Sequence, residues 1–384
     1  MTSVVPIGPF HPALKEPEHF RVEVEGEKVV NVVIKVGYNH RGIEKTATTR
    51  SYHRNIFLFE RVCGICNAAH SLCYCHTVER LFDIHVPDRA RYIRTVVAEL
   101  NRIHSHLLWF GVAMHLIGYD TLFMHAWKGR EYVMDAIEAV TGNRVNTAMN
   151  TIGGVRRDIT PKLARFVERM MDESEKATEY LAKAIEGDSV VASRVAEVGI
   201  LTKEDAVRYS VVGPTLRASG IESDVRAEDP YAAYDEVDWE VCVEDTCDVL
   251  ARVLVRVRET FESIKIVREC LRNMPEGPIV SEDVREAFPN ETFGRVEAPR
   301  GELAYYIRSN STNIPERVKV RTPSFMNIPA IVPMAVGENL ADVPIIIGSV
   351  DPCYACTDRL MVVDLKTGRE KVYTLRELVR RGGR

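Results

Sequence analysis

The sequence of 384 residues is long enough for a substantial hydrophobic core or for two domains, and its 46% hydrophobic and 27% charged residues are ordinary for a globular protein. The formal net charge of −5 and the lack of a basic block argue against nucleic-acid binding. No segment reaches 18 uninterrupted apolar residues, which argues against a transmembrane helix, and the first residues lack the pattern of a signal peptide. We therefore expect a reducing, cytoplasmic setting, where paired cysteines bind metal or act in catalysis more often than they form disulfides.

The chain begins with β-forming residues and then changes to helical patterns. Residues 19–38 contain two β-rich runs around Glu25-Gly26-Glu27, which predicts a hairpin. From residue 51 onward, apolar residues recur every three or four positions. This spacing predicts helices at 71–82, 90–116 and 129–140, with Asp88 as a cap for the second of them.

The same spacing predicts further helices at 161–185 and 237–273, and a short one capped by Thr202. Between them, residues 211–234 are punctuated by Gly and Pro and show little periodicity. So long an irregular segment inside a compact protein is usually functional or interfacial. The last third predicts short strands at 302–310, 317–323 and 343–350.

These elements predict an α+β fold that is mainly helical, with a central helical bundle and small β elements at the N-terminal and C-terminal ends, rather than a doubly wound sheet. We expect a single domain over residues 1–359. It divides into an N-terminal β region (1–50), the helical bundle (51–275) and a C-terminal β and loop region (276–359). Residues 360–384 form an extension.

Two Cys-x-x-Cys pairs carry the strongest chemical signal. They are Cys63 with Cys66 and Cys353 with Cys356, and Cys66 lies 287 positions before Cys353. Zinc ribbons separate their pairs by about 15–20 residues, and a thioredoxin-type motif needs one pair in a βαβ context. We therefore expect a site that the whole folded domain assembles from both ends of the chain.

Soft thiolates select nickel, copper(I), zinc or iron, and the cysteines alone leave these four metals open. If the first pair leads into a helix, His70 lies over it as a ligand or as a partner for sulfur. The remaining cysteines are predicted to be buried packing residues: Cys73, Cys75, Cys242, Cys247 and Cys270.

Five segments together resemble the large subunit of [NiFe] hydrogenases, in particular its membrane-associated, energy-converting and formate-hydrogenlyase-type branch. The segments are HRGIEK, RVCGICNAAH, APRGEL, RTPSFMN and DPCYACTDR. They stand in the family's order, and the resemblance extends from GPFHPALKEP to CTDR.

The resemblance implies a nickel–iron centre whose iron carries CO and CN ligands. By position, Cys63 and Cys353 match the terminal nickel ligands, whereas Cys66 and Cys356 match the cysteines that bridge nickel to iron. Cys353 is also the thiolate expected to take a proton during turnover. The implied activity is the reversible reduction of protons to H2.

Other residues match the surroundings of such a centre. Glu44 matches the carboxylate that relays protons, and Arg300 matches the guanidinium that lies over the open metal positions and contacts a cyanide. Pro323 and Ser324 match the strand that receives the diatomic ligands of the iron, and His70 matches a histidine beside a bridging cysteine.

The quinone-site (49 kDa) subunit of complex I shares the same ancestry and is the alternative. It lacks the metal cysteines and binds quinone with a tyrosine and a histidine. Tyr74 stands at the tyrosine position, whereas Lys15 stands at the histidine position. Related sulfur-reducing complexes have lost part of the cysteine set, and this chain has all four, which favours the hydrogenase.

The resemblance also implies partners. Because this chain has no further cysteine cluster, it should hold no Fe–S cluster of its own, and a small subunit with a [4Fe–4S] cluster should deliver electrons from ferredoxin or formate. Residues 211–226 are predicted to form part of that contact. Other membrane and hydrophilic subunits should hold the chain on the cytoplasmic side of the membrane. A maturation protease is expected to cut after Arg359 and release residues 360–384.

Overall fold

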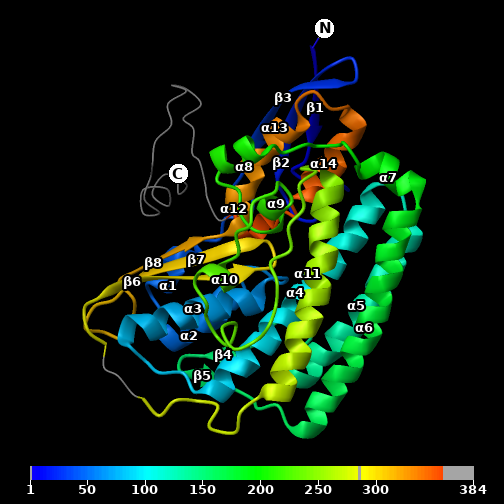
Figure 1. Ribbon diagram of the computed structural model, residues 1–384. Helices are drawn as coiled ribbons and strands as arrows, with labels where there is room; N and C mark the ends of the chain where they lie inside the picture. Colours follow the sequence, from blue (N-terminus) through cyan, green and yellow to red (C-terminus); the bar gives the residue numbers. More distant parts are fainter. Residues whose placement is uncertain (1, 284–286, 358–384) are drawn as a thin grey trace, which may run out of the picture.

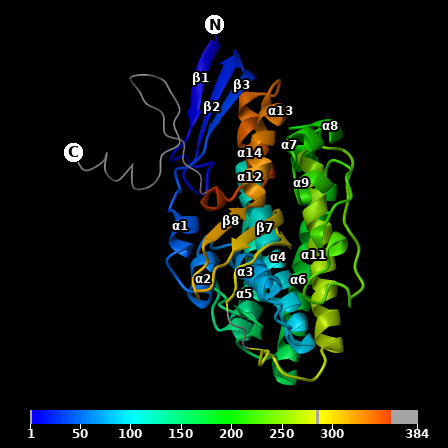
Figure 2. The same ribbon diagram turned by 90° about the vertical axis from the view of Figure 1, so that its left-hand side faces the viewer.

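The computed structural model describes residues 2–283 and 287–357. In Figure 1 a small sheet of N-terminal strands lies at the top, and a second small sheet, from the last third of the chain, lies at the left beside the helices. The long helices α4 (Asp88–Leu116), α5 (Asp120–Thr141), α6 (Pro161–Gly187) and α11 (Val249–Asn273) pack side by side in both views (Figures 1 and 2). The predicted α+β fold, with a central helical bundle and β elements at the two ends, is confirmed. Within the described residues no helix is both long and apolar enough to cross a membrane.

The N-terminal sheet contains the predicted hairpin and one strand that the sequence analysis missed. Strands β2 (His19–Glu25) and β3 (Lys28–Lys35) pair antiparallel around Gly26, whose φ of 63° suits glycine in the turn. Strand β1 (Thr2–Ile7) pairs with β2 along its whole length. Alternate residues of β2, such as Phe20, face a core shared with the short helices near the C-terminal end.

The C-terminal sheet consists of β6 (Glu291–Ala298), β7 (Gly301–Arg308) and β8 (Arg317–Arg321), all antiparallel. The predicted strands at 302–310 and 317–323 correspond to β7 and β8. Helix α3 (Asn67–Phe82) packs against β6 and β7, so that the first cysteine pair lies close to this sheet.

Short elements complete the described chain. The helices are α1 (Ile43–Ala47), α2 (Tyr52–Glu60), α7 (Ser189–Val195), α8 (Lys203–Arg208), α9 (Pro214–Arg217), α10 (Val225–Glu228), α12 (Pro323–Asn327), α13 (Ile331–Ala335) and α14 (Val343–Ser349). The 3-10 turns are η1 (Ile328–Ala330), η2 (Leu340–Asp342) and η3 (Tyr354–Cys356), and β4 (Asn150–Thr151) pairs with β5 (Gly154–Val155). Thr202 caps α8 as predicted, since its side chain accepts from the Asp205 amide.

One predicted strand was wrong because a short apolar run does not distinguish a strand from a buried helix. Residues 343–349 form α14, in which Pro344 occupies the first turn, where its missing N–H costs nothing. Pro323 and Ser324 likewise begin α12 instead of lying on a strand.

Two helix starts also differ from the prediction. The predicted helix at 237–273 begins only at Val249, because the Asp248 side chain accepts the Ala251 amide and caps α11 there. Asp88 is the first residue of α4 and does not cap it, since Pro87 precedes the helix without a side-chain cap.

Helix α4 carries two buried histidines for which the sequence suggested no partner. Nδ1 of His104 accepts a 2.8 Å hydrogen bond from Nε of Arg130, and Nε2 of His106 lies 2.8 Å from Oε2 of Glu259. Burial lowers the pKa of His104 to about 3 and that of His106 to about 4. Both rings are therefore neutral in the folded protein at neutral pH.

A neutral buried histidine makes the protein sensitive to acid. The unfolded chain protonates His104 near pH 6.5 whereas the folded protein does not, so the free energy of unfolding falls as the pH is lowered from 6.5 to 4. One such group contributes about 1.4 kcal/mol per pH unit. We expect His104→Asn, which keeps an acceptor for Arg130, to take up one proton fewer on unfolding. The free energy of unfolding, measured in urea, should therefore fall less steeply as the pH is lowered. His125→Asn is the exposed control, and an unchanged slope in His104→Asn would contradict the assignment.

Candidate metal centre

Both cysteine pairs lie at the starts of helical turns, and the fold brings them together. Cys63 follows α2, Cys66 immediately precedes α3, and Cys353 immediately precedes η3. The Cys353 thiol donates to Cys63 Sγ at 3.0 Å, and the Cys356 thiol donates to Cys353 Sγ at 3.2 Å. The cysteines that lie farthest apart in the sequence are therefore neighbours in a buried site.

The ligand atoms of Cys63, Cys353 and Cys356 all lie within 4.8 Å of one another, and these residues are the one such group among the described residues. Hydrogen bonds from Cys353, Cys356 and Cys66 hold the pKa of the Cys63 thiol well below its usual value. Cys63 Sγ also accepts from the amides of Ile65 and Cys66, each at 3.3 Å. The site therefore already favours a thiolate at Cys63.

One arginine ties the two pairs together through the backbone. The Arg41 guanidinium donates to the carbonyl of Arg61 at 3.0 Å and to that of Val62 at 2.7 Å, just before the first pair. It also donates to the carbonyl of Ala355 at 3.0 Å, inside the second pair. Arg41 belongs to the HRGIEK segment, so this segment fixes the spacing of the two motifs.

Two hydroxyl side chains hold the backbone of the second pair. Ser324 lies in α12, and Thr322 immediately precedes that helix. Ser324 Oγ accepts from the Cys353 amide at 2.9 Å, and Thr322 Oγ1 donates to the carbonyl of Cys356 at 2.8 Å. Pro323 lies between them at the start of α12. The structure thus places Pro323 and Ser324 beside the second pair, on a helix instead of a strand.

Arg300 reaches the site from the turn between β6 and β7. Its Nη1 donates to Cys66 Sγ at 3.1 Å and to Ser105 Oγ at 3.1 Å, while Nη2 lies 2.7 Å from Oδ1 of Asp351. Its Nε donates to the Asp351 carbonyl at 2.7 Å. A fixed planar donor set of this kind belongs to arginine and not to lysine.

Asp351, which the sequence analysis did not single out, is the counter-charge of Arg300. Burial raises the pKa of Asp351, but Arg300 and Lys15 outweigh this and hold it below its usual value. Lys15 Nζ lies 3.7 Å from Asp351 Oδ1, and burial lowers the pKa of Lys15. The residue at the quinone-histidine position therefore pairs with the carboxylate that orients Arg300.

His70 lies beside the second pair. Its Nε2 is 3.6 Å from Cys356 Sγ, and its Nδ1 is 2.8 Å from the hydroxyl of Tyr305 on β7. Burial lowers the pKa of His70 to about 4, so the ring is neutral and can act as a hydrogen-bond partner of sulfur.

Glu44 lies in the first turn of α1, facing β8. Its Oε1 accepts from the Val320 amide at 3.0 Å, and its Oε2 lies 2.8 Å from Lys319 Nζ. Its carboxylate is close enough to Tyr305 to contribute to the raised pKa of that phenol, although burial is the main cause. The described hydrogen bonds of Glu44 are thus to β8, while Tyr305 and His70 form the hydrogen-bonded path to Cys356.

Two further carboxylates line the second pair and were missed. Oε2 of Glu16 accepts from the Ala355 amide at 2.7 Å and lies 4.0 Å from Cys353 Sγ. Glu18 is fully buried, accepts from Thr357 Oγ1 at 3.3 Å, and burial raises its pKa to about 7. Glu16 and Glu18 flank Pro17 in GPFHPALKEPE, but nothing in the local pattern marks either carboxylate as buried.

The other cysteines of α3 lie away from the cluster. The Cys73 thiol donates to the carbonyls of Gly294 and Leu303 at 3.6 and 3.4 Å, and burial raises the pKa values of both Cys73 and Cys75. Tyr74 is fully buried and donates to the carbonyl of Tyr52 at 3.1 Å. Tyr74 therefore packs inside the protein.

The donor set fits the implied nickel–iron centre. It comprises four buried cysteines without a disulfide, three of them clustered, with Cys66 alongside and held by Arg300. Thiolates in this number suit soft metal ions. Neutral His70 and the cation Arg300 supply hydrogen bonds to sulfur and a compensating positive charge.

Comparisons with known proteins identify the family. The family described as "Nickel-dependent hydrogenase" matches residues 41–171, and "Respiratory-chain NADH dehydrogenase, 49 Kd subunit" matches residues 117–292 and 286–359. The "Carbon monoxide-induced hydrogenase" of Rhodospirillum rubrum is 41% identical over 93% of this chain and 99% of that protein. The "Membrane-bound hydrogenase subunit alpha" of Pyrococcus furiosus is 41% identical over 98% of this chain and 91% of that protein.

Among solved structures, a chain of the membrane-bound sulfane sulfur reductase, an archaeal respiratory membrane complex, superposes with a TM-score of 0.89 at 33% identity. The match covers 93% of this chain and 98% of that chain. Fold, site and comparisons agree that this chain belongs to the family of hydrogenase-type large subunits of membrane-bound complexes, to which the 49 kDa subunit of complex I is related.

Proposed function

We propose that this chain is the catalytic subunit of a [NiFe] hydrogenase that reversibly reduces protons to H2. The observation that carries the proposal is the convergence of both cysteine pairs on one buried site, with the Arg300 guanidinium held 3.1 Å from Cys66 Sγ. When bound, a nickel–iron centre would supply the redox chemistry of the reaction.

The protein's own residues would hold the metals and move protons. Cys63, Cys66, Cys353 and Cys356 would be the ligands. The Cys353 sulfur would accept and release a proton, while Arg300 would favour negative charge at the site. Because Cys63, Cys66, Cys353 and Cys356 are all buried, the surrounding side chains limit the access of water to the thiolates.

Infrared spectroscopy combined with metal analysis tests this function. The purified complex should contain nickel and iron and should show CO and CN stretching bands, which fall where protein does not absorb. Fully assembled, reduced complex without nickel and without these bands would reject the proposal. Reduction of quinone or of sulfane sulfur by such a preparation would support the alternative suggested by the 49 Kd subunit family and the sulfane sulfur reductase.

Glu44→Gln should separate proton transfer from metal binding. The amide can still accept from the Val320 amide, so the fold and the metals should be retained, but it cannot take up a proton. We expect H2 turnover to fall by about 10²–10⁴-fold, the usual contribution of general acid–base catalysis. The matched control is Glu302→Gln, a carboxylate on β7, in the sheet that Glu44 contacts, that faces Arg295. Unchanged turnover in Glu44→Gln would assign Glu44 only to the contact between α1 and β8.

The proposed partners follow from the same function. A small subunit with a [4Fe–4S] cluster would pass electrons from ferredoxin or formate, and further subunits would hold the chain at the cytoplasmic side of the membrane. Related proteins are named as parts of membrane complexes, which supports this arrangement.

We also propose that a maturation protease cuts after Arg359. Residues 360–384 lie outside the described residues. The intact mass of the metal-containing subunit should lack these 25 residues. Their presence in active enzyme would contradict the proposed cleavage.

A further inference from the structure

The position of the Arg300 guanidinium depends on a tight turn. Ala298 and Gly301 pair across the end of the β6–β7 hairpin, which leaves Pro299 and Arg300 as the two residues of the turn. The backbone is unusual at Gly301, where φ is 123°. A small displacement of this turn would move the long Arg300 side chain relative to Cys66.

Two buried side chains from other elements hold the backbone of this turn. Arg102 on α4 donates to the carbonyls of Glu297 at 2.8 Å and Ala298 at 3.2 Å. Asn327 on α12 donates to the carbonyl of Arg300 at 3.3 Å. The turn is thus hydrogen-bonded on both sides of Pro299.

The irregular segment 211–226 packs against the same turn. A Cβ atom on Gly213 would lie 2.3 Å from Cα of Gly301, so the two backbones are in close contact. Asn327 links this segment to the turn, because it accepts from the Val212 amide at 2.9 Å and donates to the Val212 carbonyl at 3.1 Å. Most of segment 211–226 is buried within this chain, so the predicted subunit contact can involve only its exposed part around Glu222.

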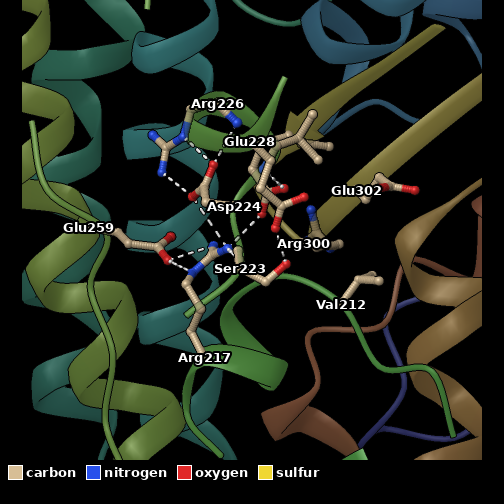
Figure 3. Close-up of polar contacts among 12 residues, drawn as sticks. Val212, Arg217, Ser223, Asp224, Arg226, Glu228, Glu259, Arg300 and Glu302 are labelled. Carbon is tan, nitrogen blue, oxygen red and sulfur yellow. Dashed lines mark hydrogen bonds and ion pairs between the residues drawn. The ribbon is translucent and has the colours of Figure 1, made fainter. Parts of the chain in front are cut away.

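Arg217 connects this segment to the end of β6 by charge, and Figure 3 shows its side chain between Asp224 and Glu259. Its guanidinium lies 2.9 Å from Oε1 of Glu297, 3.3 Å from Oδ2 of Asp224 and 2.7 Å from Oε1 of Glu259. We call the buried ionic group around it the Arg217 cluster; its members are Glu99, Arg102, Arg217, Asp224, Arg226, Glu259 and Glu297.

Stability alone does not account for so many buried charges, because their desolvation roughly cancels their attraction. A buried ionic cluster instead fixes the positions of its side chains, because a charge that moved would lose its partner. The Arg217 cluster and Asn327 contact the last two residues of β6, Glu297 and Ala298, and the turn residue Arg300.

We propose that Arg102, Arg217 and Asn327 position the Arg300 guanidinium against Cys66 by holding the β6–β7 turn. These residues contact neither pair of cysteines in the described hydrogen bonds, so they act on the metal site through Arg300. Segment 211–226 thus helps to fix the β6–β7 turn and, through it, the position of Arg300 at the metal site. This inference rests on the proposed function where it concerns H2 turnover, and on the geometry alone where it concerns Arg300.

Two substitutions test the positioning role in the assembled complex. Arg102→Lys keeps the charge opposite Glu99 but cannot hold both carbonyls of the turn, and Arg217→Lys cannot reach three carboxylates at once. For both variants we expect unchanged nickel and iron content, a shift of the CN bands, and about ten- to hundredfold lower H2 turnover.

The matched control is Arg94→Lys. Arg94 lies on the same helix as Arg102, is equally buried, pairs with Glu79 at 2.6 Å and donates to the carbonyls of Thr151 and Gly154. It makes none of the described contacts with the turn. Its substitution should lower the melting temperature as much as Arg102→Lys does, yet leave the CN bands in place. If all three variants or none of them shift the bands, the proposed positioning role is wrong.

An experimental structure of Arg102→Lys gives a readout that does not need the metals. Arg300 Nη1 should move away from Cys66 Sγ, which it approaches to 3.1 Å in the unaltered chain. Retention of that contact would overturn the inference. Absence of CO and CN bands from the unaltered complex would instead reject the proposed function and leave this structural test intact.

Discussion

Cys353→Ser should abolish nickel binding and H2 turnover. Cys353 is central among the clustered thiols, with Cys63 Sγ at 3.0 Å and Cys356 Sγ at 3.2 Å. A serine hydroxyl is a hard donor that stays protonated at neutral pH and does not replace a soft thiolate. The Cys353 amide would still donate to Ser324, so the fold should persist. Metal analysis and H2 assays of the purified complex measure the effect.

Cys73→Ser is the matched control. Cys73 is fully buried, and a hydroxyl there could still donate to the carbonyls of Gly294 and Leu303. This variant should keep its nickel and its activity. Loss of nickel from Cys73→Ser, or its retention in Cys353→Ser, would show that the site uses other thiols.

Arg300→Lys is expected to retain the metals but to lose most of the H2 turnover. Arg300 donates to Cys66, to Ser105, and to the backbone carbonyl and the carboxylate of Asp351. A lysine ammonium cannot make all four of these hydrogen bonds at once. Removal of one preorganised charged donor from an active site costs about 10²–10³-fold in turnover. We also expect about 1–3 kcal/mol lower free energy of unfolding, because Asp351 loses buried hydrogen bonds.

H2 turnover, metal content and urea unfolding of the same preparation separate these effects. Arg94→Lys serves again as the control, since it removes an equally buried bidentate pair away from the thiols. Full turnover in Arg300→Lys would mean that any positive charge near Cys66 suffices. Loss of the metals would mean that Arg300 helps to hold the centre itself.

The sequence alone predicted the elements with strong periodicity. Helices α4 and α6 repeat apolar residues over many turns, and the β2–β3 hairpin has both alternation and a glycine turn, so that local patterns sufficed. Residues 343–347 are a continuous apolar run without a period, so that the buried helix α14 could not be distinguished from a strand.

The site residues that lie in short sequence motifs could be predicted from the sequence. The Cys-x-x-Cys pairs stand out by spacing, and the resemblance supplied Arg300 and His70, which the structure places beside them. Asp351 and Glu16 were missed because their importance comes from tertiary contacts with Arg300 and Ala355. Segment 211–226 was predicted to be interfacial, and its Gly and Pro residues gave no local pattern to show that its charges pair inside the protein.

The bonds of Arg41 to the backbone of both cysteine segments have a consequence for how metal is lost. The sulfur contact between Cys63 and Cys353 closes a loop of 290 positions, yet the entropic cost of closure rises only with the logarithm of loop length. The long sequence separation of the two cysteines therefore adds little to the entropic cost of forming the site. It does mean that no fragment lacking either Cys-x-x-Cys segment contains the site, so nickel should leave in one step as the domain unfolds, without a partly folded form that retains it.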